Sequence, residues 1–167
     1  YVYRCYATNS AGEGWSQTAV RFQTPPDLAR WPYRMKISLP VSVGETLTNF
    51  PLLVCFENNI NGSGFYYGQC AQTNGGDLRF ADPTESVIFP HEIERWNTNG
   101  ISTVWVKIPA LAGTNDYFYA YWGKTNAAAP ASLTNGMVWS PEFRAVWHLG
   151  HTGDTNVLDS NTNRRHG

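Results

Sequence analysis

Glu92 and Glu94 are the residues in this sequence whose type and spacing best suit acid–base chemistry. They flank Ile93 in a segment with the pattern of a strand, and side chains two residues apart on a strand share one face at a separation of about 7 Å. That separation lies between those of retaining and inverting glycosidases. Charged pairs on the solvated face of a strand are far commoner than catalytic pairs. We therefore predict that Glu92 and Glu94 are not catalytic and that the protein is not an enzyme.

The other chemistry-bearing residues form no known catalytic or metal-binding motif. The histidines lack H-E-x-x-H spacing, no serine lies in a G-x-S-x-G turn, and the cysteines lack C-x-x-C spacing. We expect His148 to be a packed or hydrogen-bonded strand residue. Asn74, Asp77 and Asp82 are weak candidates for a structural calcium site, because calcium prefers several carboxylate and carbonyl oxygens. EF-hand spacing is absent, however, and we predict no metal and no cofactor.

The three cysteines leave two interpretations open. Cys5 is expected to lie in a different domain from Cys55 and Cys70. In an oxidising compartment, a disulfide between Cys55 and Cys70 would close the Asn-Gly loop between them. The alternative is that the thiols are free and buried.

Carbohydrate binding is a sharper hypothesis than catalysis, because flat aromatic rings beside amides suit the faces and hydroxyls of sugars. Most aromatic side chains must nevertheless fill the core of a sandwich of this size, and we expect Trp31, Trp105 and Trp122 to be packed there. The candidate ligand-binding residues are Tyr66, Tyr67, Trp96 and Glu92.

Composition excludes several classes of partner. Lys and Arg number 12 and Asp and Glu 13, so the chain has no basic field for nucleic acid or an anionic bilayer. No apolar run approaches the roughly 20 residues of a transmembrane helix, so we expect no membrane insertion. The 167 residues, 42% of them apolar, suffice for one well-buried core.

Hydrophobic periodicity predicts that strands position all of these residues. Residues 35–43 are apolar at every second position, with Pro40 favouring an edge strand. Residues 50–56 and 117–122 are apolar or aromatic on both faces, which predicts central strands covered on each side. Residues 97–100 form a hairpin turn. Strands at roughly ten-residue spacing without a helical stripe predict an all-β, antiparallel β-sandwich of jelly-roll or Ig-like type.

The first 24 residues read as two strands around a turn, and Pro25-Pro26 begins a linker over 25–30. A sequence pattern runs through this segment: a Tyr, an Ala six residues later, an Asn eight residues after the Tyr, and then a Gly in a turn and a Ser. These residues are Tyr1, Ala7, Asn9, Gly12 and Ser16. They resemble the C-terminal hairpin of a fibronectin type III domain, and the resemblance implies that Tyr1 is a corner tyrosine.

Residues 31–137 form the expected central domain, and six blocks in order carry a further resemblance. The blocks are Trp31-x-Tyr33-Arg34, Asn49-Phe50-Pro51-Leu52-Leu53-Val54, Gly76-Asp77-Leu78-Arg79-Phe80, His91-Glu92-Ile93-Glu94-Arg95-Trp96, Trp105-Val106-Lys107-Ile108-Pro109 and Tyr121-Trp122-Gly123. Over residues 31 to about 125 the chain therefore resembles the domain of unknown function DUF2341. Trp122 stands where the family pattern leads us to expect a second Tyr.

Residues 138–167 resemble the junction into a concanavalin A-like (laminin G-type) domain, with a first strand at Val146-Trp147-His148-Leu149. Truncated sandwich pieces at both ends imply a fragment of a large secreted or surface-anchored bacterial protein. We expect a non-catalytic module for adhesion or carbohydrate binding, whose partners are a polysaccharide or cell-surface glycan and the neighbouring domains. The alternatives are an accessory domain of a polysaccharide-degrading enzyme and a purely structural connector between domains.

Overall fold

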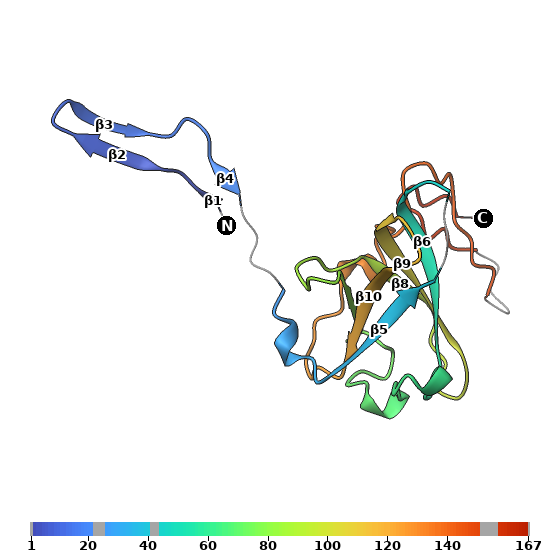
Figure 1. Cartoon of the computed structure of the whole chain (residues 1–167). Helices are drawn as coiled ribbons and strands as arrows, with labels where there is room; N and C mark the ends of the chain where they lie inside the picture. Colours follow the sequence, from blue (N-terminus) through green and yellow to red (C-terminus); the bar gives the residue numbers. More distant parts are fainter. Residues whose placement is uncertain (1, 22–25, 41–43, 151–156, 167) are drawn as a thin grey trace.

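The computed structural model describes residues 2–21, 26–40, 44–150 and 157–166 (Figure 1). Strands are the main regular structure of these residues, with no α-helix among them, which confirms the predicted all-β class. The helices among them are single 3-10 turns of three residues, and none is long or apolar enough to cross a lipid bilayer. These turns are η1 (Leu28–Arg30), η2 (Ile60–Gly62), η3 (Tyr67–Gln69) and η4 (Ala131–Leu133).

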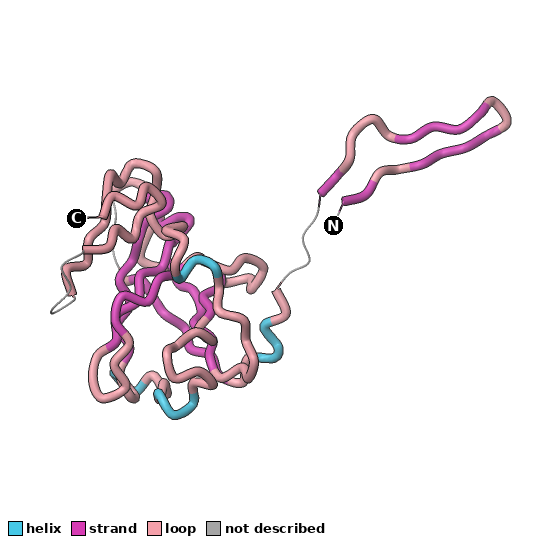
Figure 2. Tube along the Cα trace, turned by 180° about the vertical axis from the view of Figure 1, so that it is seen from behind, coloured by secondary structure: helices cyan, strands magenta, loops and turns pink. Residues whose placement is uncertain are grey.

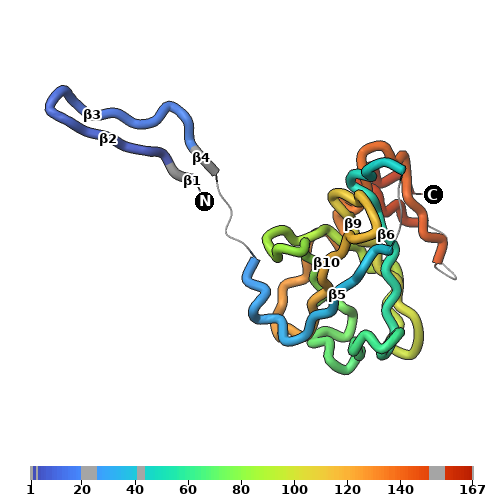
Figure 3. The backbone as a smooth tube through the Cα atoms, viewed as in Figure 1, coloured from blue at the N-terminus to red at the C-terminus, as the bar shows by residue number. Residues whose placement is uncertain are grey.

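Two three-stranded antiparallel sheets, formed by strands between residues 33 and 122, pack face to face (Figures 1, 2 and 3). One has the order β5-β10-β7 and the other β6-β9-β8. The predicted antiparallel β-sandwich is therefore confirmed. The strands are β5 (Tyr33–Leu39), β6 (Leu47–Phe56), β7 (Arg79–Ala81), β8 (His91–Arg95), β9 (Ser102–Leu111) and β10 (Asp116–Trp122).

The two middle strands supply the centre of the core. Alternate residues of β9 point inward, and alternate residues of β10 face them from the other sheet. Removing each large apolar side chain from water stabilises the fold by about 1.5–3 kcal/mol. The inward residues are Val104, Val106 and Ile108 on β9 and Phe118, Ala120 and Trp122 on β10.

The edge strands only partly match their predictions. β5 is an edge strand, as predicted, and ends at Leu39 before Pro40, while residues 41–43 lie outside the described residues. β6 was predicted to be central, which is wrong, because it lies at the edge of its sheet. Pro51 lacks a backbone donor, which an edge strand tolerates, and Leu53 is 43% exposed.

β10 is central, as predicted, but its outer face is covered only at one end. Tyr121 is buried there against Leu28 and Ala81. Tyr117 and Tyr119 remain half-exposed. The aromatic residues on both faces of this strand thus reflect a packed inner face and a partly open outer face.

The N-terminal strands form the predicted antiparallel hairpin. β2 (Tyr6–Asn9) pairs with β3 (Gly12–Trp15), and β1 (Val2–Tyr3) pairs with β4 (Val20–Arg21). Every residue of β2 and β3 is exposed. Tyr1, the proposed corner tyrosine, lies outside the described residues.

The segment after Val138 forms loops in the parts that the structure describes, 138–150 and 157–166. A strand was expected at Val146–Leu149, but none of the described residues pairs with it in a sheet. Instead, the N–H of Val146 donates to the Asp159 carboxylate at 2.8 Å, and its carbonyl accepts from the Ser160 N–H at 2.8 Å. Side-chain and loop contacts therefore replace the expected sheet pairing.

His91 on β8 is a polar residue in the apolar core. Its side chain is fully buried, its ring lies edge-on to Phe80 with centroids 5.0 Å apart, and neither ring nitrogen has a hydrogen-bond partner among the described residues. Burial lowers the pKa of His91 from 6.5 to about 3. The ring is therefore neutral in the folded protein at every pH near neutrality.

We expect His91→Leu to stabilise the protein most strongly in mild acid. Below pH 6.5 the unfolded chain binds a proton at His91 that the folded chain does not, so stability falls by roughly 1.4 kcal/mol per pH unit down to the folded pKa. Urea denaturation at pH 5 and pH 7 should show that this fall is smaller in the variant. An unchanged pH slope would mean that His91 titrates normally in the folded state.

Candidate functional site

Of the four predicted ligand-binding residues, Tyr66 alone presents an exposed ring, at 44%. Tyr67 is 8% exposed, and its hydroxyl lies 2.7 Å from Ser102 Oγ and 2.8 Å from the carbonyl oxygen of Phe56. Burial raises the pKa of Tyr67. The Tyr67 ring therefore belongs to the core and offers no face to a sugar.

Trp96 also packs inward instead of forming a binding platform. Its ring is half-buried and meets the Tyr67 ring edge-on, with centroids 5.2 Å apart. Gly75 has a φ of +75°, and a Cβ placed there would lie 2.8 Å from the Trp96 ring. The glycine thus allows the backbone to close over the indole, which leaves that ring face covered.

The weak calcium candidates serve as backbone caps. The carboxylate of Asp77 is fully buried and accepts hydrogen bonds from three backbone N–H groups, while Asn74 caps Gly76 at 3.0 Å. The donors to Asp77 are Ala71, Gln72 and Gly123. Within the described residues, no group of three or more His, Cys, Asp or Glu side chains is placed to hold a metal ion.

The three cysteines are free. Cys55 is exposed on the outer face of β6, whereas Cys70 packs against the core cluster, so the two side chains lie on different sides of the sheet. The disulfide interpretation is therefore not supported. Burial, with a smaller contribution from the charge of Asp77, raises the pKa of Cys70 to about 12.

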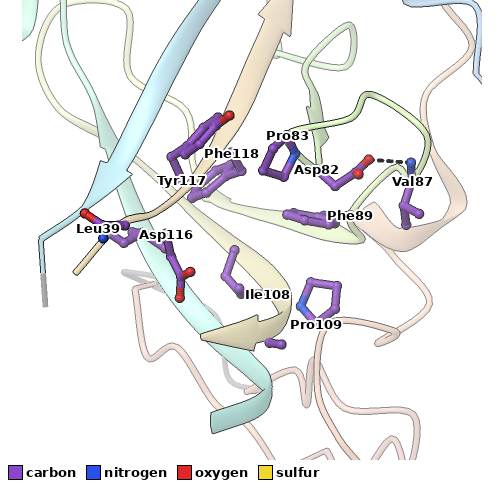
Figure 4. Close-up of a pocket in the computed structure, with 12 residues that line it drawn as sticks. Leu39, Asp82, Pro83, Val87, Phe89, Ile108, Pro109, Asp116, Tyr117 and Phe118 are labelled. Atoms are coloured by element: carbon purple, nitrogen blue, oxygen red, sulfur yellow. Dashed lines mark hydrogen bonds between the residues drawn. The ribbon is translucent and has the colours of Figure 1, made fainter. Parts of the chain in front are cut away.

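A cavity of about 470 Å³ opens at the end of the sandwich where β5 and β9 finish and β10 begins (Figure 4). Apolar side chains from both sheets line it, including Phe89, Ile108 and Phe118. The carboxylates of Asp82 and Asp116 lie at its wall, but each caps backbone N–H groups of its own turn. As far as the described residues line it, the cavity therefore offers apolar surface and no free charged group.

The strongest polar constellation lies on the outer face of the β6-β9-β8 sheet. Glu92 on β8 sits directly across from Trp105 on β9, with both side chains on this face. The loop after η4 returns over it, so that the Glu92 carboxylate accepts from Trp139 Nε1 at 2.8 Å and pairs with His148 Nε2 at 2.9 Å. Glu92 is 7% exposed. We call these residues, together with Glu94, the Glu92 cluster.

Glu94, the second carboxylate of the pair noted in the sequence, also belongs to this cluster. It accepts a hydrogen bond from Trp105 Nε1 at 2.6 Å and lies 3.7 Å from His148 Nδ1. The rings of Trp105 and His148 are stacked, with an interplanar angle of 22°. Glu92 is therefore not part of a solvated surface ladder, which the sequence led us to expect, but is buried beneath the returning loop, while Glu94 beside it stays exposed.

The ionisation of the two principal groups favours an ion pair. Burial opposes ionisation of Glu92, but hydrogen bonds from His148, Ser160 and Trp139 outweigh it, and its pKa lies below the ordinary 4.5. The hydrogen bond to Glu92 raises the pKa of His148 above 6.5, despite opposition from burial. His148 was predicted to be a packed or hydrogen-bonded strand residue. The structure confirms the hydrogen bond, but His148 lies in a loop and not in a strand.

A second anchor holds the two described parts of the tail together. The Asp159 carboxylate, fully buried, accepts from the N–H groups of Val146, Asn161 and Arg165. Gly136, with φ +76°, packs against this turn, since a Cβ there would lie 2.6 Å from the Thr162 nitrogen. Nothing in the local sequence around Trp139 indicates its contact with β8, and nothing around Asp159 indicates its bond to Val146, because both contacts join residues far apart in the chain.

The chain is thus an antiparallel β-sandwich with a carboxylate-centred contact on one outer face. Residues 74–139 match the family model described as "Domain of unknown function (DUF2341)". The match supports the resemblance inferred from the sequence over this range, which includes Glu92, Glu94, Trp105 and Trp139 but not His148. No curated protein and no solved structure matched the chain.

We expect Glu92→Gln to lower the free energy of unfolding by about 2 kcal/mol at pH 5.5, because hydrogen bonds to charged groups contribute about 1.5–3 kcal/mol. Because folding raises the pKa of His148, its stabilising contribution is fully present below pH 6.5. That contribution is lost as the pH rises through the pKa of His148 in the folded protein. The lowered pKa of Glu92 makes its contribution complete above pH 4.5 and lost in stronger acid.

The difference between wild type and Glu92→Gln should therefore be greatest between pH 4.5 and 6.5 and smaller at pH 9. Urea denaturation at pH 5.5 and pH 9 measures it. Glu45→Gln, which removes an exposed carboxylate, is the matched control and should change stability by less than about 0.5 kcal/mol. Equal effects of the two substitutions would contradict this account of the cluster.

Proposed function

We propose that the protein is a non-catalytic structural module whose β6-β9-β8 sheet holds the returning segment in a fixed position. The observation that carries this proposal is the buried Glu92 carboxylate, which bonds Trp139 and His148 of that segment at 2.8 and 2.9 Å. A buried charge that loses its partners costs several kcal/mol, so the segment is favoured in this one position.

The state of the carboxylates supports a structural role over a catalytic one. Both oxygens of Glu92 have partners within the protein, and Glu94 is bonded to Trp105. A general acid or base needs a free oxygen within reach of a substrate proton. A cavity of about 620 Å³ lies beside this contact, lined among others by Glu92, Glu94 and His148. Both oxygens of Glu92 are nevertheless already bonded to Trp139 and His148, so neither is free to exchange a proton with a molecule in that cavity.

The wider setting of the module rests on its resemblances. Residues 1–24 resemble part of a fibronectin type III domain, and residues 138–167 the start of a concanavalin A-like domain. In such an arrangement the protein would be secreted or displayed on the cell surface, and its partners would be neighbouring sandwich domains. A rigid joint then keeps the modules on either side in a defined relative orientation.

A second candidate function is adhesion or carbohydrate binding. The protein would have this function if it were an accessory domain of a polysaccharide-degrading enzyme. The exposed ring of Tyr66 favours it, because that ring is available for stacking on a sugar face. Tyr67 and Trp96 do not add to it, since both rings are packed. A Tyr66→Ala variant that bound polysaccharides as well as the wild type would remove this support.

We call the contact between the β6-β9-β8 sheet and the returning segment, residues 138–150 and 157–166, the joint. It can be tested by measuring the distance between one spin label on the sheet and another on the segment. Cys55 on β6 and Leu158→Cys, whose native side chain is 57% exposed, are the labelling sites in a Cys5→Ser background. Cys70 is half-buried, with a pKa raised to about 12, and should resist labelling. We expect one narrow distance distribution, because the Glu92 cluster and Asp159 fix the segment.

Substitution of both members of the ion pair, Glu92→Gln with His148→Gln, should broaden that distribution while the circular dichroism of the sheet is retained. Trp139→Phe removes only the indole N–H and should broaden it less. Glu45→Gln is the control and should leave it narrow. A broad distribution in the wild type, or a narrow one in the double variant, would show that the cluster does not set the position of the segment.

A further inference from the structure

The outer face of the other sheet, β5-β10-β7, carries a row of aromatic rings and cations that the joint does not use. Three tyrosines point outward from β10, opposite two basic side chains and a serine on β5. The cross-strand pairs are Tyr117 with Ser38, Tyr119 with Lys36 and Tyr121 with Arg34. Tyr117 and Tyr119 are partly buried, Tyr119 against the Leu28 cluster, and Lys36 and Arg34 are exposed. We call this the tyrosine face.

Cations lie over the rings along the whole row. Lys36 Nζ is 3.9 Å from the centre of the Tyr117 ring, and the Arg34 guanidinium is 5.1 Å from that of Tyr119. At the other end, Lys124 Nζ lies 4.1 Å from the centre of the Trp31 ring. At the rise of a strand, the three tyrosines from Tyr117 to Tyr121 span roughly 13 Å, and Lys124 follows beyond the end of β10.

Two of these cations are available to a ligand. Arg34 is paired with Glu85 at 2.6 Å, and the Arg79 guanidinium donates to backbone carbonyls. Lys36 and Lys124, by contrast, make no hydrogen bond to another described residue, so each ammonium keeps its three donors for a ligand or water. They lie toward opposite ends of the row, with the tyrosine rings between them.

A row of this kind suits an extended polymer that has apolar ring faces, hydroxyl edges and regularly placed anions. Aromatic rings contact the apolar faces of sugars, tyrosine hydroxyls bond sugar hydroxyls, and lysines pair with carboxylate or sulfate groups. A single-stranded nucleic acid presents a much denser line of charge than a few cations on a chain of net charge −1 can match. Charge complementarity therefore favours a glycan.

We propose that the tyrosine face binds an acidic polysaccharide, with Lys36 and Lys124 contacting its anionic groups and Tyr117 and Tyr119 its sugar rings. The proposal does not depend on the joint, because the two sites lie on opposite sheets. It also differs from binding at Tyr66, since it requires charge on the polymer and uses none of the residues of that loop.

A comparison of acidic polymers with their neutral counterparts distinguishes binding that depends on charge from recognition of the sugar rings alone. The whole chain is titrated calorimetrically with polygalacturonate and its neutral methyl ester, and with dextran sulfate and neutral dextran. We expect at least one acidic polymer to bind, its neutral counterpart not to bind, and the affinity to fall as salt rises from about 50 to about 200 mM. Binding of one acidic polymer but not the other would assign carboxylate or sulfate as the preferred group.

Variants then locate the binding site. Lys36→Gln with Lys124→Gln should weaken binding about tenfold or more, and Tyr119→Ala should weaken it without changing the salt dependence. Arg144→Gln, which removes an exposed charge elsewhere, is the control and should bind like the wild type. The thermal transition of each variant shows that it is folded.

Three results would overturn the proposal. The first is binding to the neutral polymers as strong as to the acidic ones, or no binding to any of them. The second is equal loss in Arg144→Gln and in the lysine double variant. The third is tighter binding to a single-stranded oligonucleotide than to either acidic polymer. Each of these leaves the joint between the sheet and the segment unaffected.

Discussion

An ionised carboxylate held almost out of water on the outer face of a sheet must be given partners, and this requirement determines how the second half of the chain is arranged. Glu92 is 7% exposed, and its partners are Trp139 and His148, far along the sequence. Without them the desolvation of the carboxylate would be uncompensated. The segment that carries them therefore lies across β8 and β9 instead of extending into solvent.

This arrangement makes the two outer faces of the sandwich unlike. The β6-β9-β8 face is covered by the chain itself at β8 and β9, where its polar groups bond one another, while Cys55 on β6 stays exposed. The β5-β10-β7 face is covered at the Tyr121 end by Leu28 and Trp31 and is otherwise open, with cations lying over aromatic rings. One face thus has the properties of an internal joint, and the other those of a surface for an external partner.

The sequence predicted the local structure better than the contacts between distant segments. Two-residue periodicity identified the strands of the sandwich, because alternation is a property of neighbouring residues. It could not distinguish edge from centre for β6, since the apolar side chains of that strand indicate burial on both faces although Leu53 is 43% exposed. It also could not show that Tyr67 is packed and Tyr66 exposed, because the two residues are adjacent and of the same type.

The candidate site shows the same limit. Glu92 and Glu94 stand out in the sequence as a pair, but pairing alone did not reveal that one is buried. The deciding contacts, from Trp139 and His148, come from a loop with no periodic pattern. The capping roles of Asp77 and Asp82 were hidden for a related reason, since a carboxylate that accepts backbone N–H groups has the same sequence signature as one that binds calcium.

The central claim is that Glu92 and His148 act as one unit, and a double-mutant cycle tests it most directly. Urea unfolding of the wild type, Glu92→Gln, His148→Gln and the double variant at pH 5.5 gives the coupling energy between the two side chains. We predict a coupling of at least about 1 kcal/mol, because a buried, charge-assisted hydrogen bond joins them. Additive effects, with a coupling near zero, would contradict the account.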